Sequence, residues 1–222
     1  MTLTSLLRRK AQSTIPSPSD GQSTLLPGPQ YTQSSQRIRD YVETFTRKLL
    51  SGEHYVVVML RSEKLKRSIL STPSKVNSCI GGILSDWEEM RNSTNATKSL
   101  FFSDAGKYGS VTLHKPSASS FSKEVYNKMR SHLAVDDVNS VLKGMTNSSD
   151  SVQIAILHQQ LAARASCVIL IGYGSFQAHT LSIHAHLHRG KECYVLRGGN
   201  CKKKYVKRFP ISWTERPYYV AA

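Results

Sequence analysis

Residues 163–182 read ARASCVILIGYGSFQAHTLS, and this stretch decides the fold class. Its centre is an uninterrupted apolar run, residues 167–171, which is typical of a strand buried on both faces of a parallel sheet. The run ends at the turn Gly172-Tyr173-Gly174, after which residues 175–188 have the length and pattern of a helix. The stretch therefore predicts a strand, a glycine turn and a helix in succession.

The segments on either side extend this alternation. On the N-terminal side, Asp150 and Gln153 resemble a capping box, and apolar residues at helical spacing predict a helix that ends near residue 165. On the C-terminal side, ECYVLR, residues 192–197, predicts a returning strand. The elements predicted before residue 150 are, in order, a helix over 37–50, a strand over 55–60, a helix over 77–91, a strand over 100–103, a strand over 110–114 and a helix over 121–133. Helices and strands in alternation predict an α/β fold, Rossmann-like, with a mainly parallel sheet and helices on both faces.

Composition divides the chain into three parts. Residues 1–35 are rich in Ser, Pro, Gly and Gln without an apolar period, which predicts a flexible segment. Residues 36–200 hold the predicted α/β domain, and residues 201–222 are expected to form a basic tail. The sequence contains neither a signal peptide nor an apolar stretch of membrane-spanning length.

The charge of the chain indicates which partners it attracts. Thirty Lys and Arg residues stand against fifteen Asp and Glu residues, which gives a formal net charge of +15. Such a field attracts phosphate-bearing molecules whatever the fold beneath it. Nucleic acid, a nucleotide ligand and an anionic membrane surface all remain open at this point.

The cysteines and histidines do not predict a metal site. The four cysteines include no C-x-x-C pair, so zinc is disfavoured, and the choice between two disulfides and buried free thiols stays open. His184 and His188 lie one helical turn apart and could share an ion, but no third ligand is evident nearby. Partly exposed histidines on a helix face are the default expectation. Three N-glycosylation sequons, at Asn92, Asn95 and Asn147, favour a secretory protein weakly.

Polar residues stand at the carboxyl ends of three predicted strands, where ligands bind in open parallel sheets. Arg61 ends the first strand, Asp104 ends the second, and residues 172–176 follow the third. An arginine binds phosphate through two parallel hydrogen bonds, and free N–H groups at a helix start attract the same anion. A dinucleotide fingerprint is not supported, because Gln177 stands where G-x-G-x-x-G requires its third glycine, and the P-loop motif is absent. The plain alternative is that Gly, Ser and Asp are ordinary turn residues.

Three segments, in the same order, resemble motifs of the GDP-fucose protein O-fucosyltransferases and their relatives. HYVVVMLRSEK, residues 54–64, resembles their strand and arginine motif. SLFFSDAGKYGS, residues 99–110, resembles their segment of a strand followed by T-D or S-D. ASCVILIGYGSFQ, residues 165–177, resembles their late A-D-x-x-x-G-x-x-S-[ST]-F-S segment. The resemblance covers roughly residues 36–190, about the C-terminal half of a full-length family member.

The resemblance implies a GT-B glycosyltransferase whose C-terminal Rossmann-like domain binds GDP-fucose and transfers fucose to a hydroxyl of a protein or glycan. It implies that Arg61 contacts the diphosphate and is the catalytic residue that stabilises the departing GDP, without a metal or other cofactor. It also implies that Asp104 lies near the nucleoside and that Gly174, Ser175 and Phe176 line the GDP-sugar pocket. The compartment it implies is the lumen of the endoplasmic reticulum or Golgi.

The chain also departs from the family's pattern. Met59 stands where the family usually has His two residues before the arginine, and Ser166 replaces the Asp of the A-D pair. The family's N-terminal domain is expected to be missing, which makes the chain either a fragment or a diverged, inactive relative. Two alternatives remain: a non-enzymatic basic module for nucleic acid, which is the less favoured partner, and another nucleotide-sugar Rossmann enzyme.

Overall fold

A computed structural model describes residues 36–104, 116–147, 150–172 and 174–207. The predicted flexible segment 1–35 and the predicted strand 110–114 lie outside these residues, as does most of the predicted basic tail. The helices of the described part are α1 (Gln36–Leu49), α2 (Arg67–Leu70), α3 (Pro73–Thr94), α4 (Pro116–Met129), α5 (Val138–Thr146), α6 (Ser151–Ala163) and α7 (Ser175–Leu187). None of them is both long enough and apolar enough to cross a membrane.

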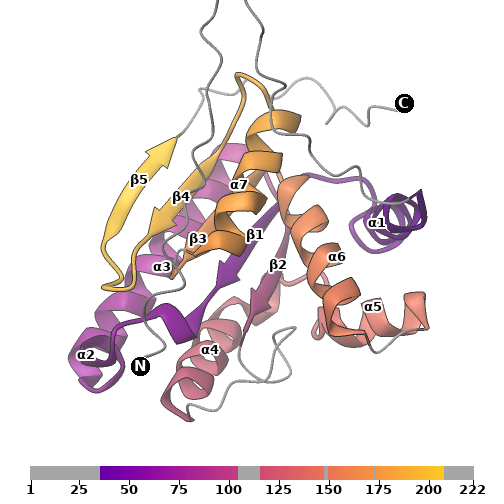
Figure 1. Cartoon of the computed structure of the whole chain (residues 1–222). Coiled ribbons are helices and arrows are strands. Elements are labelled where there is room, and N and C mark those ends of the chain that lie inside the picture. The colour runs from indigo at the N-terminus through magenta and orange to yellow at the C-terminus, as the bar shows by residue number, and fades with distance from the viewer. Residues whose placement is uncertain (1–35, 105–115, 148–149, 173, 208–222) are drawn as a thin grey trace, which may run out of the picture. The chain divides into compact units, whose positions relative to one another are not determined.

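One sheet of five strands organises the described residues, in the spatial order β2-β1-β3-β4-β5 (Figure 1). The strands are β1 (Tyr55–Leu60), β2 (Lys98–Ser103), β3 (Cys167–Ile171), β4 (Tyr194–Arg197) and β5 (Lys203–Lys207). The first four in this order are parallel, and β5 pairs with β4 in the antiparallel direction. The predicted α/β fold with a mainly parallel sheet is therefore confirmed.

Helices cover both faces of this sheet, which explains why its inner strands are apolar throughout. Every residue of β1 and of β3 is buried. Successive side chains of β1 point to opposite faces, so Val56 and Val58 pack in one core while Val57 and Met59 pack in the other. The first core lies beneath α3 and α4, and the second beneath α1, α5 and α6 (Figure 1). The second face is the one that carries the site described below.

The sheet extends beyond the predicted domain boundary at residue 200. Lys203–Lys207 forms β5, whose Val206 pairs with Val195 of β4, so the start of the predicted basic tail belongs to the folded domain. The sequence KKKYVK did not indicate a strand because its lysines hide the alternation of side chains. Lysine is nevertheless common on edge strands, where its charge discourages pairing with another chain.

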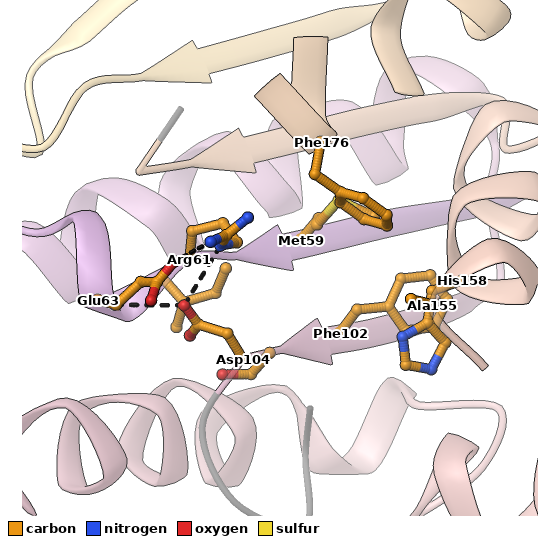
Figure 2. A pocket seen from close by; sticks show the side chains of 10 residues that line it. Met59, Arg61, Glu63, Phe102, Asp104, Ala155, His158 and Phe176 are labelled. Atoms are coloured by element: carbon orange, nitrogen blue, oxygen red, sulfur yellow. Dashed lines mark hydrogen bonds and ion pairs between the residues drawn. The ribbon is translucent and has the colours of Figure 1, made fainter. Parts of the chain in front are cut away.

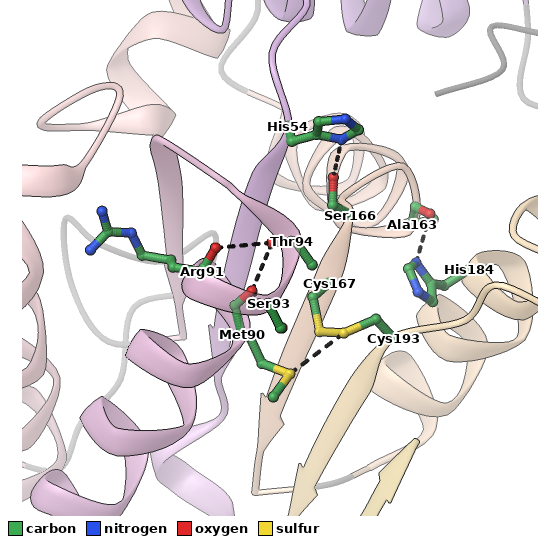
Figure 3. The surroundings of a disulfide bond; sticks show 10 residues. All are labelled: His54, Met90, Arg91, Ser93, Thr94, Ala163, Ser166, Cys167, His184 and Cys193. Carbon is green, nitrogen blue, oxygen red and sulfur yellow. Dashed lines mark hydrogen bonds between the residues drawn. A yellow bond between two sulfur atoms is a disulfide. The ribbon is translucent and has the colours of Figure 1, made fainter. Parts of the chain in front are cut away.

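Two disulfides fix the β4–β5 side of the sheet. Cys79 of α3 is bonded to Cys201, which lies between β4 and β5, and Cys167 at the start of β3 is bonded to Cys193 just before β4. Figure 3 shows the second bond, with Cys193 Sγ lying 3.5 Å from Met90 Sδ. Of the two states left open by the sequence, the structure has the paired one.

A buried ion pair holds α3 against the same side of the sheet. Arg197 donates from Nε to Asp86 Oδ2 at 2.7 Å, and its other nitrogens donate to the carbonyls of Gly82 and Cys201 at 2.8 Å. A Cβ on Gly82 would lie 2.9 Å from a nitrogen of this guanidinium, so the helix needs a glycine where Arg197 crosses it. Glycine is a poor helix former, but at position 82 its missing side chain leaves the space that the Arg197 guanidinium occupies.

Removal of the Asp86 charge should destabilise the fold. Asp86→Asn is expected to lower the free energy of unfolding by about 3 kcal/mol, because it leaves the Arg197 charge buried without its counter-ion. Glu88→Gln, an exposed position on the same helix, is the matched control and should change stability by less than about 0.5 kcal/mol. Urea unfolding followed by circular dichroism measures both. Equal losses in the two variants would contradict a stabilising role for the buried pair.

Candidate functional site

A cavity of about 140 Å³ lies at the carboxyl ends of β1 and β2, bordered by α6 and the first turn of α7 (Figure 2). One end of it is polar and is lined by Arg61, Glu63, Ser103 and Asp104. The other end is apolar and aromatic, and its lining includes Met59, Leu60, Phe102, Ala155, His158 and Phe176. The cavity therefore offers one charged and one aromatic region side by side.

The polar end is built around the Arg61 guanidinium. Arg61 forms an ion pair with Glu63, and its Nε lies 3.4 Å from Asp104 Oδ2 without the geometry of a hydrogen bond. The side chain of Arg61 remains 26% exposed, so its guanidinium is accessible from the cavity. Arg61 is thus a cation in contact with two carboxylates, of which Glu63 is the more exposed.

The Asp104 carboxylate closes the turn that carries this arginine. Its Oδ1 accepts hydrogen bonds from the backbone N–H of Ser62 at 2.8 Å and from the Ser62 hydroxyl at 2.7 Å. Its Oδ2 accepts a longer bond, 3.3 Å, from the Glu63 backbone N–H. These bonds fix the short 3₁₀ turn Ser62–Lys64 and link the end of β2 to the end of β1.

Burial sets the protonation behaviour of Asp104. Desolvation raises the pKa of this carboxyl above its usual 3.8, and the hydrogen bonds from Ser62 and the charge of Arg61 offset the effect only in part. A raised folded-state pKa means that the proton on Asp104 stabilises the fold. That stabilisation is fully present below the unfolded pKa and is lost as the pH rises through the folded pKa.

The neutral variant Asp104→Asn should lack this pH dependence. The difference in unfolding free energy, wild type minus variant, is expected to fall as the pH rises from about 3.8 upward, and to level off above the folded pKa. Urea unfolding at a series of pH values measures this difference. If this difference in unfolding free energy stays flat with pH, folding does not shift the pKa of Asp104. If it rises with pH, the folded state favours the charged carboxylate. Either result would contradict the prediction.

The aromatic end is formed by side chains from three elements. Phe102 of β2 stacks on His158 of α6, with ring centroids 4.4 Å apart and planes 10° apart. Phe176, in the first turn of α7, lies across the cavity from this pair, with Met59 of β1 behind it (Figure 2). Burial lowers the pKa of His158 to about 3, so its ring is neutral at physiological pH.

Of the two glycines in the turn between β3 and α7, Gly172 is the one that the backbone requires. Its φ is +71°, and a Cβ there would lie 2.3 Å from the carbonyl oxygen of Arg61. Gly174 has an extended backbone, φ −154°, and the nearest atoms to a Cβ on it would be 3.8 Å away. Gly172 thus allows the end of β3 to pack against the residue that ends β1.

Alanine substitutions should separate the two glycines. Gly172→Ala is expected to lower the free energy of unfolding by at least about 2 kcal/mol, because of both the left-handed backbone and the overlap with Arg61. Gly174→Ala, at the N-cap of α7, is the matched control and should cost less than about 1 kcal/mol. Thermal and urea unfolding of the two variants test this order, and a reversed order would contradict it.

Three of the predicted site residues line the cavity: Arg61, Asp104 and Phe176. Gly174 and Ser175 do not line it; they begin α7 beside it, and Ser175 is exposed. Sequence reasoning missed Glu63, which pairs with the arginine, and His158. The signal for His158 was its spacing of three residues after Ala155, which places both on one helix face, but only the fold shows that this face borders the cavity.

Lys64 is a further cation that the sequence did not single out. Its side chain runs along the glycine turn: its Cβ would lie 3.1 Å from a Cβ on Gly172, and its Cε 3.8 Å from one on Gly174. Lys64 is exposed, so its ammonium group can approach an anion bound at the start of α7. The free N–H groups of that first turn attract the same kind of anion.

The sequence predicts that the histidines of α7 are partly exposed, and His184 is not. His184 is fully buried, and its Nδ1 lies 3.0 Å from the carbonyl oxygen of Ala163 (Figure 3). Burial, together with the charge of the neighbouring His188 ring 4.4 Å away, lowers the pKa of His184 to about 3. The default of partly exposed histidines is wrong for His184, because α7 packs this face against α6. Within the described residues no group of three or more His, Cys, Asp or Glu side chains is arranged to hold a metal ion.

Comparisons of the chain with protein-family models, with curated proteins and with solved structures find no match. Any functional assignment therefore depends on the chemistry of the cavity and on the sequence motifs themselves.

Proposed function

We propose that this chain is a fucosyltransferase-like domain that binds GDP-fucose and acts in fucose transfer to a hydroxyl of a protein or glycan acceptor. The observation that carries the proposal is the two-part cavity, which has a cation at one end and aromatic side chains at the other. It lies at the carboxyl edge of a parallel sheet, where nucleotides bind in α/β folds. A nucleoside diphosphate has the matching two-part chemistry.

The polar end suits a diphosphate. The Arg61 guanidinium can donate two parallel hydrogen bonds to phosphate oxygens, and its ion-pair partner Glu63 is partly exposed. The first turn of α7 and the side chain of Lys64 add N–H donors and positive charge beside the same end. In this role a diphosphate displaces Glu63 from Arg61.

The aromatic end suits a nucleoside. Phe176 and the stacked pair of Phe102 and His158 offer flat surfaces to a base, and Met59 adds a polarizable apolar contact. Met59 is also the residue that departs from the histidine of the family motif. The substitution exchanges a polar contact for an apolar one at this end of the cavity.

Arg61 has the catalytic role in this proposal. Sugar transfer from GDP-fucose breaks the bond between the sugar and the β-phosphate and leaves negative charge on the departing diphosphate. A guanidinium that is held in place before the reaction stabilises this charge in the transition state. The Asp104 carboxylate orients the turn that carries Arg61, so Asp104 is a positioning residue.

The disulfides bear on the compartment. Both form between cysteines that are buried in the described fold, and disulfides persist in oxidising compartments such as the secretory lumen. Together with the exposed sequon residues Asn92, Asn95 and Asn147, they support a proposed location in the endoplasmic reticulum or Golgi lumen.

A thermal-shift titration with GDP tests the proposed site. Saturating GDP should raise the Tm of the wild type, and Arg61→Ala should abolish that shift. Glu63→Gln should instead tighten GDP binding by about threefold to tenfold, because it removes a competing acceptor and a repulsive charge. Arg67→Ala, an exposed arginine of α2 outside the cavity, is the matched control and should leave the shift unchanged.

The outcomes also separate the alternative functions. A wild-type Tm that does not respond to GDP or GDP-fucose contradicts the proposal. The net charge of +15 favours nucleic acid as the second candidate, and binding to it would weaken steeply with salt and survive Arg61→Ala. A shift with UDP or NAD in place of GDP would indicate a different nucleotide enzyme on the same fold.

A further inference from the structure

Exposed cations lie on three segments that meet beside the polar end of the cavity, and we name this surface the basic patch. Its residues are Lys64 in the 3₁₀ turn, Lys66 and Arg67 at the start of α2, Lys75 in the first turn of α3, and Lys202 between β4 and β5. None of these side chains forms an ion pair among the described residues. The patch therefore presents positive charge that the described part of the chain does not neutralise.

A backbone hydrogen bond and a disulfide hold the three segments together. The N–H of Lys66 donates to the carbonyl of Gly199 at 2.7 Å, which brings the turn between β4 and β5, with Lys202, against the start of α2 (Figure 1). The disulfide between Cys79 and Cys201 joins the same turn to α3, one helical turn beyond the lysine of α3. The charges of the basic patch are thus carried by a backbone of fixed arrangement.

Lys64 connects the basic patch to the cavity. Its side chain runs along the glycine turn, with Cε 3.8 Å from a Cβ on Gly174, beside the polar end where Arg61 lies. In the proposed function the base occupies the aromatic end and the diphosphate the polar end. The sugar on the β-phosphate then leaves the cavity at the polar end, so an acceptor hydroxyl has to approach it next to the basic patch.

The chemistry of the basic patch favours carboxylates over nucleic acid or lipid. Four of its five cations are lysines, which are point charges, whereas arginine is the residue that recognises phosphate through a rigid fork. Residues 62–85 and 197–203 contain no aromatic residue, so these segments offer no ring on which a base could stack. A membrane-binding surface would add large exposed apolar side chains, but those of the described residues, Val152, Ile156 and Leu187, lie on α6 and α7.

We propose that the basic patch binds acidic side chains of a polypeptide acceptor, close to the hydroxyl that receives the sugar. This inference rests on the proposed function, which supplies the position of the sugar. The proposed function leaves the acceptor open between a protein and a glycan, whereas the basic patch selects a protein with Asp or Glu near the acceptor hydroxyl. The same charges attract such a segment over a distance and speed its arrival.

Fluorescence anisotropy with a labelled peptide tests the basic patch. The probe has one serine flanked on both sides by glutamates, and the control peptide has glutamine in place of each glutamate. The wild type should bind the acidic probe and not the control peptide, and binding should weaken as salt is raised. The triple variant Lys66→Gln, Arg67→Gln, Lys202→Gln should bind the probe about tenfold more weakly, because three exposed ion pairs are lost.

A matched triple variant separates the basic patch from the net charge of the chain. Exposed positions on α1 and α5 lose the same charge in Arg47→Gln, Lys48→Gln, Lys143→Gln, which should leave the Kd for the probe unchanged. Equal weakening in the two triple variants would overturn the proposal. Binding of a single-stranded oligonucleotide or of phosphatidylserine vesicles, with no binding of the acidic probe, would overturn it as well.

GDP separates the failure of this inference from that of the proposed function. Saturating GDP should leave the probe bound, and the patch variant should keep the wild-type Tm shift with GDP, because these three residues lie outside the cavity. Displacement of the probe by GDP would contradict the basic patch while the GDP site stands. If the wild type does not respond to GDP, the proposed function is wrong and the acceptor role fails with it, even where the patch variant loses the probe.

A single substitution covers the case in which the triple variant does not fold. Lys202→Glu reverses one charge at an exposed position between β4 and β5. It should weaken binding of the acidic probe about fivefold, because it places a like charge beside the glutamates. An unchanged Kd for the probe in this variant would contradict the proposal.

Discussion

The arrangement of the site depends on one carboxylate. Asp104 joins the carboxyl ends of β1 and β2 through its bonds to the backbone and hydroxyl of Ser62, and so it fixes the turn from which Arg61 projects. This carboxylate is buried beside a cavity to which we assign an anionic ligand, which is electrostatically unfavourable for both. The guanidinium between them resolves the conflict, because its Nε lies 3.4 Å from the carboxylate and its outer nitrogens can bind the ligand once Glu63 is displaced. Arg61 therefore serves both the packing of Asp104 in the fold and the proposed binding of a ligand.

Much of the fold could be predicted because its central strands are marked by composition. YVVVML and CVILI are apolar throughout, as strands buried on both faces must be, and their alternation with helices leaves few topologies. The same logic brought Arg61, Asp104 and Phe176 to one edge of the sheet. Features that depend on contacts between distant segments could not be predicted: the pairing of β5, the crossing of Arg197 over Gly82, and the place of His158 in the cavity wall.

The glycine turn shows why a motif alone assigns residues incompletely. The family resemblance implied that Gly174, together with Ser175 and Phe176, lines the pocket. In the structure, Gly172 has the left-handed backbone and meets the carbonyl of Arg61, while Gly174 has space around it. The difference arises because the close neighbour is the end of another strand, more than a hundred residues earlier in the chain. A local pattern contains no information about that neighbour.

The lysines of β5 give the positive charge of the chain a second meaning. In the sequence, KKKYVK counts toward a basic field that attracts phosphate. In the fold it is the outermost strand of the sheet, with Lys203 directed inward to Asp86 at 2.5 Å and further lysines at 204 and 207 along the strand. At least one lysine of the basic composition is thus used in an ion pair inside the fold and is not available to recognise a ligand.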